Sequence, residues 1–162
     1  MDFILIRVDN RLIHGQIIEG WLPYLQSSRI VVVNDEVADD LFRKMILEMA
    51  VPYDIEVRVY TVEEFSKEYS HATADGKRTI VLFENIVDVL NAYRLNFRFG
   101  KLNIGNVHSE EGKVCFTPSI FLNERDVKDL MHLIELGVEV EVRCVPRDKP
   151  INFRDVAKEI KF

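Results

Sequence analysis

Residues 3–33, FILIRVDNRLIHGQIIEGWLPYLQSSRIVVV, contain the pattern that decides the fold. Residues 3–8 are a short, mainly apolar run, and residues 30–33 are a second one; both runs are typical of β-strands. Between them, apolar side chains recur at helical spacing: Ile17, Ile18, Trp21, Leu22 and Leu25. A strand, a helix and a strand in this order predict a βαβ unit, in which the two strands are parallel.

The rest of the chain repeats this alternation. Five more strand-like runs occur at residues 55–60, 79–83, 102–104, 114–116 and 138–142. Helical patterns occur at residues 39–50, 61–69, 86–96, 123–136 and 152–160. Thr61 and Glu64 have the spacing of a capping box, and Gly137 is typical of a residue that follows a helix. We therefore predict one α/β domain over residues 1–162, a three-layer open sheet of about seven mainly parallel strands with helices on both faces.

Composition limits the classes of function. The chain has 162 residues, of which 48% are hydrophobic, as expected for an ordinary globular domain. Its net charge of −6 argues against nucleic acid as a partner, because an acidic surface repels phosphate backbones. Cys115 and Cys144 are far apart and match no metal-binding motif, so we expect two buried free thiols, no metal site and no cofactor.

The first residues do not match a targeting segment. Asp2 precedes the apolar run and Arg7 interrupts it, whereas a signal peptide has a basic start and a longer apolar stretch. No run approaches the roughly 18 apolar residues of a membrane span. The sequence thus predicts a soluble, cytoplasmic protein.

The segment richest in side chains that can bind ligands or react is RVDNRLIHGQ, residues 7–16, between the first strand and the first helix. In a parallel sheet, ligands bind at the carboxyl ends of the strands, where this segment lies. His14 precedes the helix, whose free N–H groups favour an anion. Arg7 and Arg11 are suited to binding phosphate, and a neutral histidine ring is a nucleophile near neutral pH. Asp9 is placed to orient His14 or to pair with an arginine.

A purely structural explanation of the same segment competes with this one. A lone histidine in a loop is commonly structural or solvated, and arginines at strand ends are often surface ion pairs of little energy. The local chemistry alone therefore leaves the two explanations about equally weighted. If the segment binds phosphate, Asn10 is a further candidate donor, and Gly15 allows close approach to the backbone.

RVDNRLIHGQ followed by Trp21 resembles the signature of the IIB components of the mannose/fructose/sorbose family of the bacterial phosphoenolpyruvate-dependent sugar phosphotransferase system. The resemblance continues in order along the chain, through RIVVVNDEVADD (29–40), LFENIVDV (82–89), LNIGNV (102–107) and GVEVEVRCVPRD (137–148). It implies an open, mainly parallel sheet of about seven strands and a transferase that carries phosphohistidine.

The resemblance also implies roles for single residues. His14 matches the histidine that accepts a phosphoryl group from a IIA partner and passes it to a sugar bound in IIC and IID membrane components. Arg7, Arg11, Asn10, Gly15 and Gln16 match the phosphate-binding loop, with Asp9 as the orienting residue. No cofactor is implied, and the chain would reach the membrane through its transporter partners.

Two segments depart from the family pattern. Glu84 replaces a hydroxyl residue common in a turn of these proteins, and it must point away from the phosphoryl site or pair with Arg7, Arg11 or Lys101. Asn106 and Val107 follow Gly105 where members commonly have glycine and methionine, and His108 comes next. For His108 we expect a structural or surface role rather than a role at the site.

Two other functions remain open at this point. The first is a phosphocarrier that regulates rather than transports, since chemistry at His14 serves both. The second is a non-catalytic module that binds a nucleotide or a phosphorylated metabolite at the strand ends. The second lacks support from a glycine-rich motif, because the sequence contains neither G-x-G-x-x-G after the first strand nor a P-loop.

Overall fold

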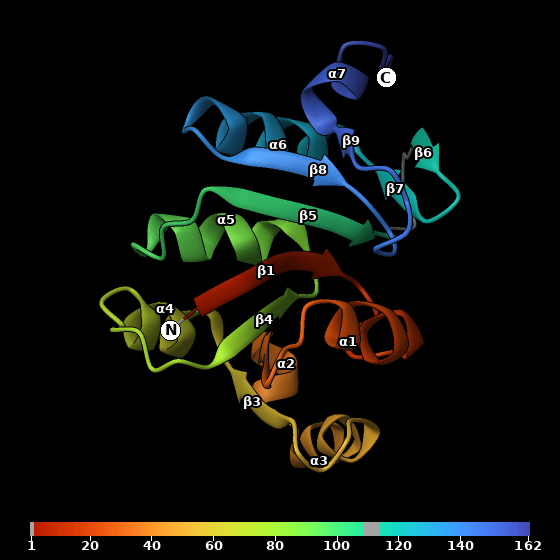
Figure 1. Cartoon of the computed structure of the whole chain (residues 1–162). Helices are drawn as coiled ribbons and strands as arrows, with labels where there is room; N and C mark the ends of the chain where they lie inside the picture. Colours follow the sequence, from red (N-terminus) through yellow and green to blue (C-terminus); the bar gives the residue numbers. More distant parts are fainter. Residues whose placement is uncertain (1, 109–113) are drawn as a thin grey trace.

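The computed structural model describes residues 2–108 and 114–162. Its main feature is a seven-stranded sheet in the order β3-β2-β4-β1-β5-β8-β9 (Figure 1). All neighbouring strands are parallel except β8 and β9, which are antiparallel. The strands are β1 (Asp2–Asp9), β2 (Arg29–Val33), β3 (Glu56–Tyr60), β4 (Arg78–Phe83), β5 (Lys101–Asn106), β8 (Glu139–Val142) and β9 (Ile151–Asn152).

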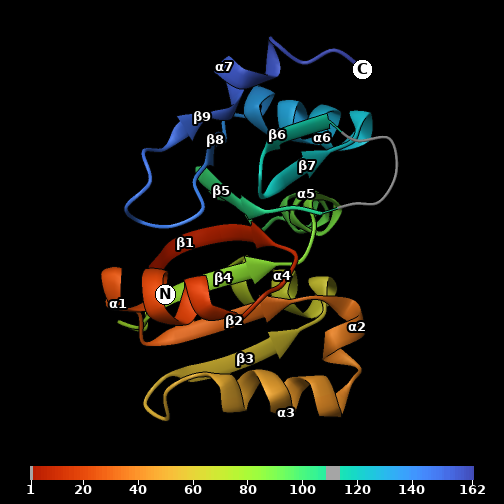
Figure 2. The same cartoon turned by 90° about the vertical axis from the view of Figure 1, so that its right-hand side faces the viewer.

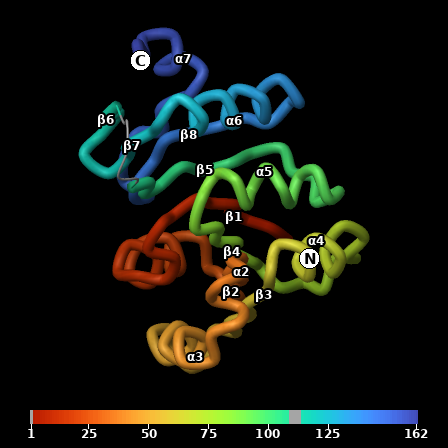
Figure 3. The backbone as a smooth tube through the Cα atoms, turned by 180° about the vertical axis from the view of Figure 1, so that it is seen from behind, coloured from red at the N-terminus to blue at the C-terminus, as the bar shows by residue number. Residues whose placement is uncertain are grey.

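Helices cover both faces of the sheet (Figure 2). On one face lie α4 (Val62–Tyr69), α5 (Ile86–Arg94) and α6 (Glu124–Glu135), which Figure 3 shows from behind. On the other face lie the π-helix η1 (Gln16–Trp21) and α1 (Leu22–Tyr24), which continues it. The remaining helices are α2 (Asp35–Ala38), α3 (Leu41–Ala50) and α7 (Phe153–Ala157).

The central strands carry two apolar cores, one on each face. In β2, Val31 and Val33 belong to the core under α4, α5 and α6, whereas Ile30 and Val32 belong to the core under η1. Successive side chains of a strand point to opposite faces, so a strand covered on both sides reads as a continuous apolar run. This explains why residues 30–33 are apolar without alternation.

The predicted fold class is confirmed, and the differences concern small elements. The run at residues 114–116 does not join the main sheet: β6 (Val114–Thr117) pairs with β7 (Ile120–Leu122) in a separate antiparallel sheet. The seventh strand of the main sheet is instead β9, whose two residues are too short to give a periodic signal. The last helix, expected to reach residue 160, ends at Ala157.

Local helix signals are matched by the structure. Thr61 and Glu64 form the expected capping box, and Asn123 and Asp126 form a second one. Gly137 has a φ of 99° after α6, a conformation that glycine adopts without strain.

The first helix differs in type from the expected α-helix. Residues 16–21 form a π-helix, in which the N–H of Leu22 bonds to the carbonyl of Ile17, five residues back. Pro23 follows directly and has no N–H, so the carbonyl of Glu19 cannot receive the usual α-helical bond. The apolar pattern predicted a helix but not this bonding.

The helix α3 is largely exposed, and the two cysteines correct an expectation. No residue of α3 is buried, although Leu41, Met45, Leu47 and Met49 give it an apolar pattern. Met49 is 82% exposed, whereas Leu47 packs on the η1-side core. Cys115 is exposed and Cys144 is partly exposed, so the prediction of two buried thiols was wrong.

The structure also bears on a membrane-spanning role. In the parts of the chain that the structure describes, no helix has the length and apolar character needed to cross a bilayer.

Candidate active site

The carboxyl ends of neighbouring strands bring the predicted loop together with residues from the second half of the chain. In the register of β1 and β5, Arg7 lies opposite Asn103 and Asp9 lies opposite Asn106. Because parallel strands end at one edge of the sheet, polar residues more than 90 positions apart meet there.

Asp9 is the centre of the site and is fully buried. Its Oδ2 accepts hydrogen bonds from His14 Nε2 at 2.7 Å, from Asn106 Nδ2 at 2.9 Å and from Arg7 Nη2 at 3.0 Å. Its Oδ1 accepts from the backbone N–H of Arg11 at 3.1 Å. Burial raises the pKa of Asp9, but the hydrogen bond from His14 and the charge of Arg7 outweigh burial and leave this pKa below its ordinary value. Asp9 is therefore an anion at neutral pH.

His14 is held at both its ring and its backbone. Its side chain keeps 13% of its surface exposed while Nε2 faces Asp9. Its carbonyl accepts from the N–H groups of Ile17 and Ile18, each at 3.0 Å, which fixes the start of η1. An ionised Asp9 can only accept, so Nε2 donates the proton of this bond and Nδ1 holds the ring's lone pair.

The turn that places His14 contains a strained residue. Leu12 has a φ of 58°, which is unusual for a residue other than glycine. Its N–H bonds to the carbonyl of Asp9 at 3.0 Å, and the side chains of Leu12 and Ile13 are buried in the η1-side core. Core burial thus holds the turn that directs His14 towards Asp9.

Arg7 is fully buried, and among the described residues its guanidinium donates hydrogen bonds to other buried or partly buried groups of the protein. Its Nη1 donates to Asn103 Oδ1 at 2.7 Å and to the carbonyl of Arg143 at 2.9 Å, while Nε and Nη2 donate to Asp9. Burial lowers the pKa of Arg7, and Asp9 acts in the opposite direction. The guanidinium presents no surface to a ligand, which disfavours the predicted phosphate-binding role.

Gly105 makes room for Arg7. A Cβ at Gly105 would lie 1.8 Å from Arg7 Cζ, which is a severe steric clash between non-bonded atoms. The absence of a side chain here is therefore what admits the buried guanidinium.

The other predicted residues surround His14 and Asp9. Arg11 is exposed, and its Nη2 lies 3.3 Å from Asn106 Oδ1. Gln16 Oε1 accepts from Asn106 Nδ2 at 3.0 Å. Asn10 donates its backbone N–H to Asn106, and its buried Oδ1 has no partner among the described residues. Gly15 is exposed with open space around the position of a Cβ, so both it and Arg11 can meet a ligand.

Several residues of the site carried no prediction. Asn103, Arg143 and Trp21 hold Arg7 from behind: Trp21 Nε1 donates to the carbonyl of Cys144 at 2.9 Å, and the guanidinium carbons of Arg7 and Arg143 lie 5.5 and 5.3 Å from its ring centre. Asn106 was noted only as a departure from a family pattern. Its position at a predicted strand end next to a glycine was the available signal.

The two other flagged residues lie outside this cluster. Glu84 accepts a hydrogen bond from Asn34 and so points away from Arg7 and Arg11, while Lys101 pairs with Glu141 at 3.2 Å. His108 stacks on Phe121, with ring centres 5.2 Å apart. Among the described residues, no group of three or more histidine, cysteine, aspartate or glutamate side chains is arranged to hold a metal ion.

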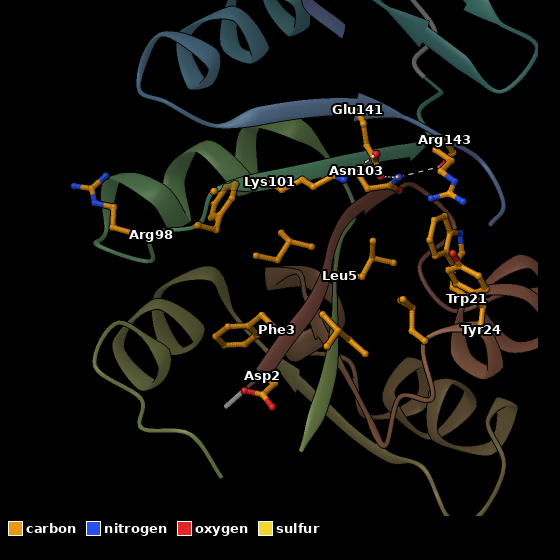
Figure 4. Close-up of a pocket in the computed structure, with 15 residues that line it drawn as sticks. Asp2, Phe3, Leu5, Trp21, Tyr24, Arg98, Lys101, Asn103, Glu141 and Arg143 are labelled. Carbon is orange, nitrogen blue, oxygen red and sulfur yellow. Dashed lines mark hydrogen bonds and ion pairs between the residues drawn. The ribbon is translucent and has the colours of Figure 1, made fainter. Parts of the chain in front are cut away.

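Two hollows lie near the site. The larger, about 740 Å³, lies on the sheet face over β1, β5 and β8. Figure 4 shows Arg98 at one end of it and Arg143 with Trp21 and Tyr24 at the other, where Asn103 lies beside Arg143. It reaches the support of Arg7 but does not border His14. The smaller, about 660 Å³, begins at Gly15 and Gln16 and runs to Pro146 and Arg147. The smaller hollow is thus lined by the two residues that directly follow the predicted nucleophile in the chain.

Comparison with known proteins identifies relatives that match nearly the whole chain in sequence and in fold. The family model described as PTS system sorbose subfamily IIB component matches residues 3–162. The sorbose-specific EIIB component of Klebsiella pneumoniae is 32% identical over 162 residues, which is 100% of this chain and 99% of that protein. The mannose-specific EIIAB component of Escherichia coli is 32% identical over 156 residues, and this chain spans 48% of it. The crystal structure of the IIBSor domain of the K. pneumoniae sorbose permease superimposes with a TM-score of 0.90, at 32% identity, covering 100% of this chain and 99% of that one.

Proposed function

The chain belongs to the sorbose subfamily of IIB components of the phosphotransferase system, phosphotransferases that take a phosphoryl group from IIA and pass it to sugar, and we propose that His14 is the residue that carries this group. The observation that supports His14 most is its hydrogen bond to the buried carboxylate of Asp9. This bond fixes the ring, sets its tautomer and leaves one nitrogen free.

The free nitrogen is Nδ1, which we assign as the phosphorylated atom. A bond forms between Nδ1 and phosphorus as the bond from phosphorus to the ring nitrogen of the donor histidine breaks, and the donor nitrogen keeps the electron pair. The Nε2 proton stays between His14 and Asp9. The Asp9 carboxylate thereby balances the positive charge that the phosphorylated ring acquires.

Arg11 and Arg7 support this step in different ways. Arg11 is exposed, and among the described residues its guanidinium contacts Asn106 Oδ1 alone, at 3.3 Å, so it can turn to bind phosphoryl oxygens. Arg7 is buried and contacts Asp9 instead. We therefore assign phosphate binding to Arg11, with Asn10, Gly15 and Gln16 lining the same loop, and assign to Arg7 the positioning of Asp9.

The partners proposed for this chain are those of its family. They are a IIA component as donor, and a sugar bound by IIC and IID membrane components as the final acceptor, which would place the chain at the membrane through those components. The name EIIAB of the mannose-specific relative joins the A and B functions in one protein. The hollow that begins at Gly15 and Gln16 is the surface we propose for partner contact, since these two residues directly follow His14.

Mapping the phosphoryl group tests the assignment. We expect the chain, incubated with phosphoenolpyruvate, the general phosphotransferase proteins and a IIA component, to carry one acid-labile phosphoryl group on His14 in mass-spectrometric peptide maps. His14→Ala should remain unphosphorylated, while His71→Ala, which alters an exposed histidine, should behave as the parent. A phosphoryl group found on another residue, or retained in His14→Ala, would refute the assignment.

A further inference from the structure

The side chain of Asn106 contacts three residues of the proposed phosphoryl site. It is the last residue of β5, is 3% exposed and lies opposite Asp9 in the sheet. Its amide nitrogen donates to Asp9 Oδ2 and to Gln16 Oε1, and its amide oxygen contacts Arg11 Nη2. Both sides of the amide are therefore used within the site.

The key feature is that Asn106 and His14 donate to the same atom. Asp9 Oδ2 receives His14 Nε2 at 2.7 Å and Asn106 Nδ2 at 2.9 Å, in addition to the guanidinium of Arg7. Hydrogen bonds to a carboxylate stabilise its charged form and lower its pKa, so the oxygen is a weaker acceptor for each further donor. Arg7 and Asn106 therefore share the Asp9 carboxylate with His14. Arg11 does not donate its side chain to this oxygen and instead contacts Asn106 Oδ1.

We propose that Asn106 is a positioning residue that raises the tendency of His14 to give its phosphoryl group away. It does so by weakening the hydrogen bond between His14 Nε2 and Asp9, and by binding the Arg11 guanidinium when no phosphoryl group is present. The inference rests on the proposed role of His14.

The direction of the effect follows from charge. The phosphorylated ring is more positive than the free ring, so a stronger Asp9 acceptor stabilises the phosphorylated form more than the free form. Removing Asn106 leaves Asp9 Oδ2 with fewer donors and frees Arg11 to bind phosphoryl oxygens. Both changes favour retention of the group on His14.

The test compares the parent with Asn106→Gly and Asn106→Leu. Both variants remove the amide; glycine also loosens the backbone, whereas leucine keeps a side chain branched at the same atom, so agreement between them assigns the effect to the hydrogen bonds. Asn96→Gly is the matched control, because Asn96 follows α5 with a φ of 73° that glycine adopts freely. The first measurement is the equilibrium distribution of the phosphoryl group between a IIA component and each variant. The second is the ring N–H resonance of unphosphorylated His14 in proton NMR.

We expect both Asn106 variants to hold more of the phosphoryl group, by about threefold, which is the order of effect of one neutral hydrogen bond on an equilibrium. We also expect the Nε2 proton to move downfield as its bond to Asp9 strengthens, and Asn96→Gly to change neither quantity. An unchanged distribution, or one shifted towards IIA, would overturn the inference even if transfer became slower. If the parent itself is not phosphorylated on His14, the proposed function fails. In that case an Nε2 proton resonance that is the same in the parent and in the Asn106 variants would also refute the idea that Asn106 weakens the bond from His14 to Asp9.

Discussion

Two arginines in one loop have different environments, and the difference predicts different consequences of mutation. Arg11 is exposed, so Arg11→Ala should change the free energy of unfolding by no more than about 0.5 kcal/mol. It should slow phosphoryl transfer by about 10- to 100-fold, because hydrogen bonds to charged groups contribute about 1.5–3 kcal/mol and each 1.36 kcal/mol is tenfold in rate. Rapid-quench kinetics with a phosphorylated IIA component measures this.

The control for Arg11 is Arg94→Ala, since Arg94 is an exposed arginine in the last turn of α5. It should transfer at the parental rate. Arg11→Lys should fall between the parent and Arg11→Ala, because an ammonium keeps the charge but loses the bidentate geometry. Equal rates for Arg11→Ala and Arg94→Ala would remove Arg11 from the mechanism.

Gly105 gives a prediction about stability. Gly105→Ala places a methyl group at the position of the Arg7 guanidinium, which is buried and bonded on several sides. Overpacking of this kind should lower the free energy of unfolding by about 1–3 kcal/mol, measured by urea denaturation. Gly100→Ala is the matched control, because no atom lies within 4 Å of the added carbon there. Identical urea midpoints for the two variants would mean that Arg7 moves aside at no cost.

Single residues were predictable where their chemistry is local. The sequence placed Asp9, Arg11 and His14 in one loop, and the structure brings them together around Asp9. It did not reveal that Arg7 is buried, because that depends on Gly105, Asn103 and the carbonyl of Arg143, which come from strands distant in sequence. The role of Asn106 was hidden for the same reason.

Among the helices, α5 carries a carboxyl group with an unusual titration. Burial, followed by the charge of Asp35, raises the pKa of Asp88 from 3.8 to about 6. Between these values the folded chain holds a proton that the unfolded chain releases, so the contribution of this group to stability is full below about pH 4 and is lost as pH rises through about 6.

Asp88→Asn should therefore stabilise the chain only when the parental carboxyl is ionised. At pH 7.5 we expect a gain of about 1 kcal/mol in the free energy of unfolding, less than the full pKa difference would give because the side chain is partly exposed. At pH 4 the gain should disappear. Thermal unfolding at both pH values tests this, with Asp155→Asn in the first turn of α7 as control. A gain that is equal at the two pH values would contradict the role of ionisation.

Elements were predictable in proportion to the length of their signal. The capping box of α4 is a short-range pattern and appears as predicted, whereas the capping box of α6 was not predicted. Helix α3 was recognised as a helix, but its apolar residues did not reveal that Met45 and Met49 remain exposed, because burial depends on what packs against the helix. The strands β7 and β9, of three and two residues, are set by tertiary pairing rather than by their own sequence.

For the whole molecule, the alternation of strands and helices was enough to predict a parallel sheet covered on both faces. What it could not give is the strand order β3-β2-β4-β1-β5-β8-β9, and with it the meeting of β1 and β5 that builds the site. The strands β2 and β4 place alternate side chains in both cores, whereas the buried apolar residues of β5 and β8 belong to the core under α4, α5 and α6. This arrangement predicts that residues 1–162 unfold as one unit.

In a domain that unfolds cooperatively, a mutation that destabilises one core also lowers the stability of the other, and Trp21 fluorescence can detect this. Trp21 is the single tryptophan, is 2% exposed and lies in the η1-side core, whereas Phe65 is fully buried in the core on the opposite face. Phe65→Ala should cost about 3–5 kcal/mol. If the domain unfolds in one step, the urea midpoint of Trp21 fluorescence should fall together with the midpoint of far-UV circular dichroism. Phe42→Ala, at a side chain 71% exposed on α3, should leave both midpoints unchanged. A fluorescence midpoint that stays in place while the dichroism midpoint falls would mean that the two cores unfold separately, because the strands they share would then not couple them.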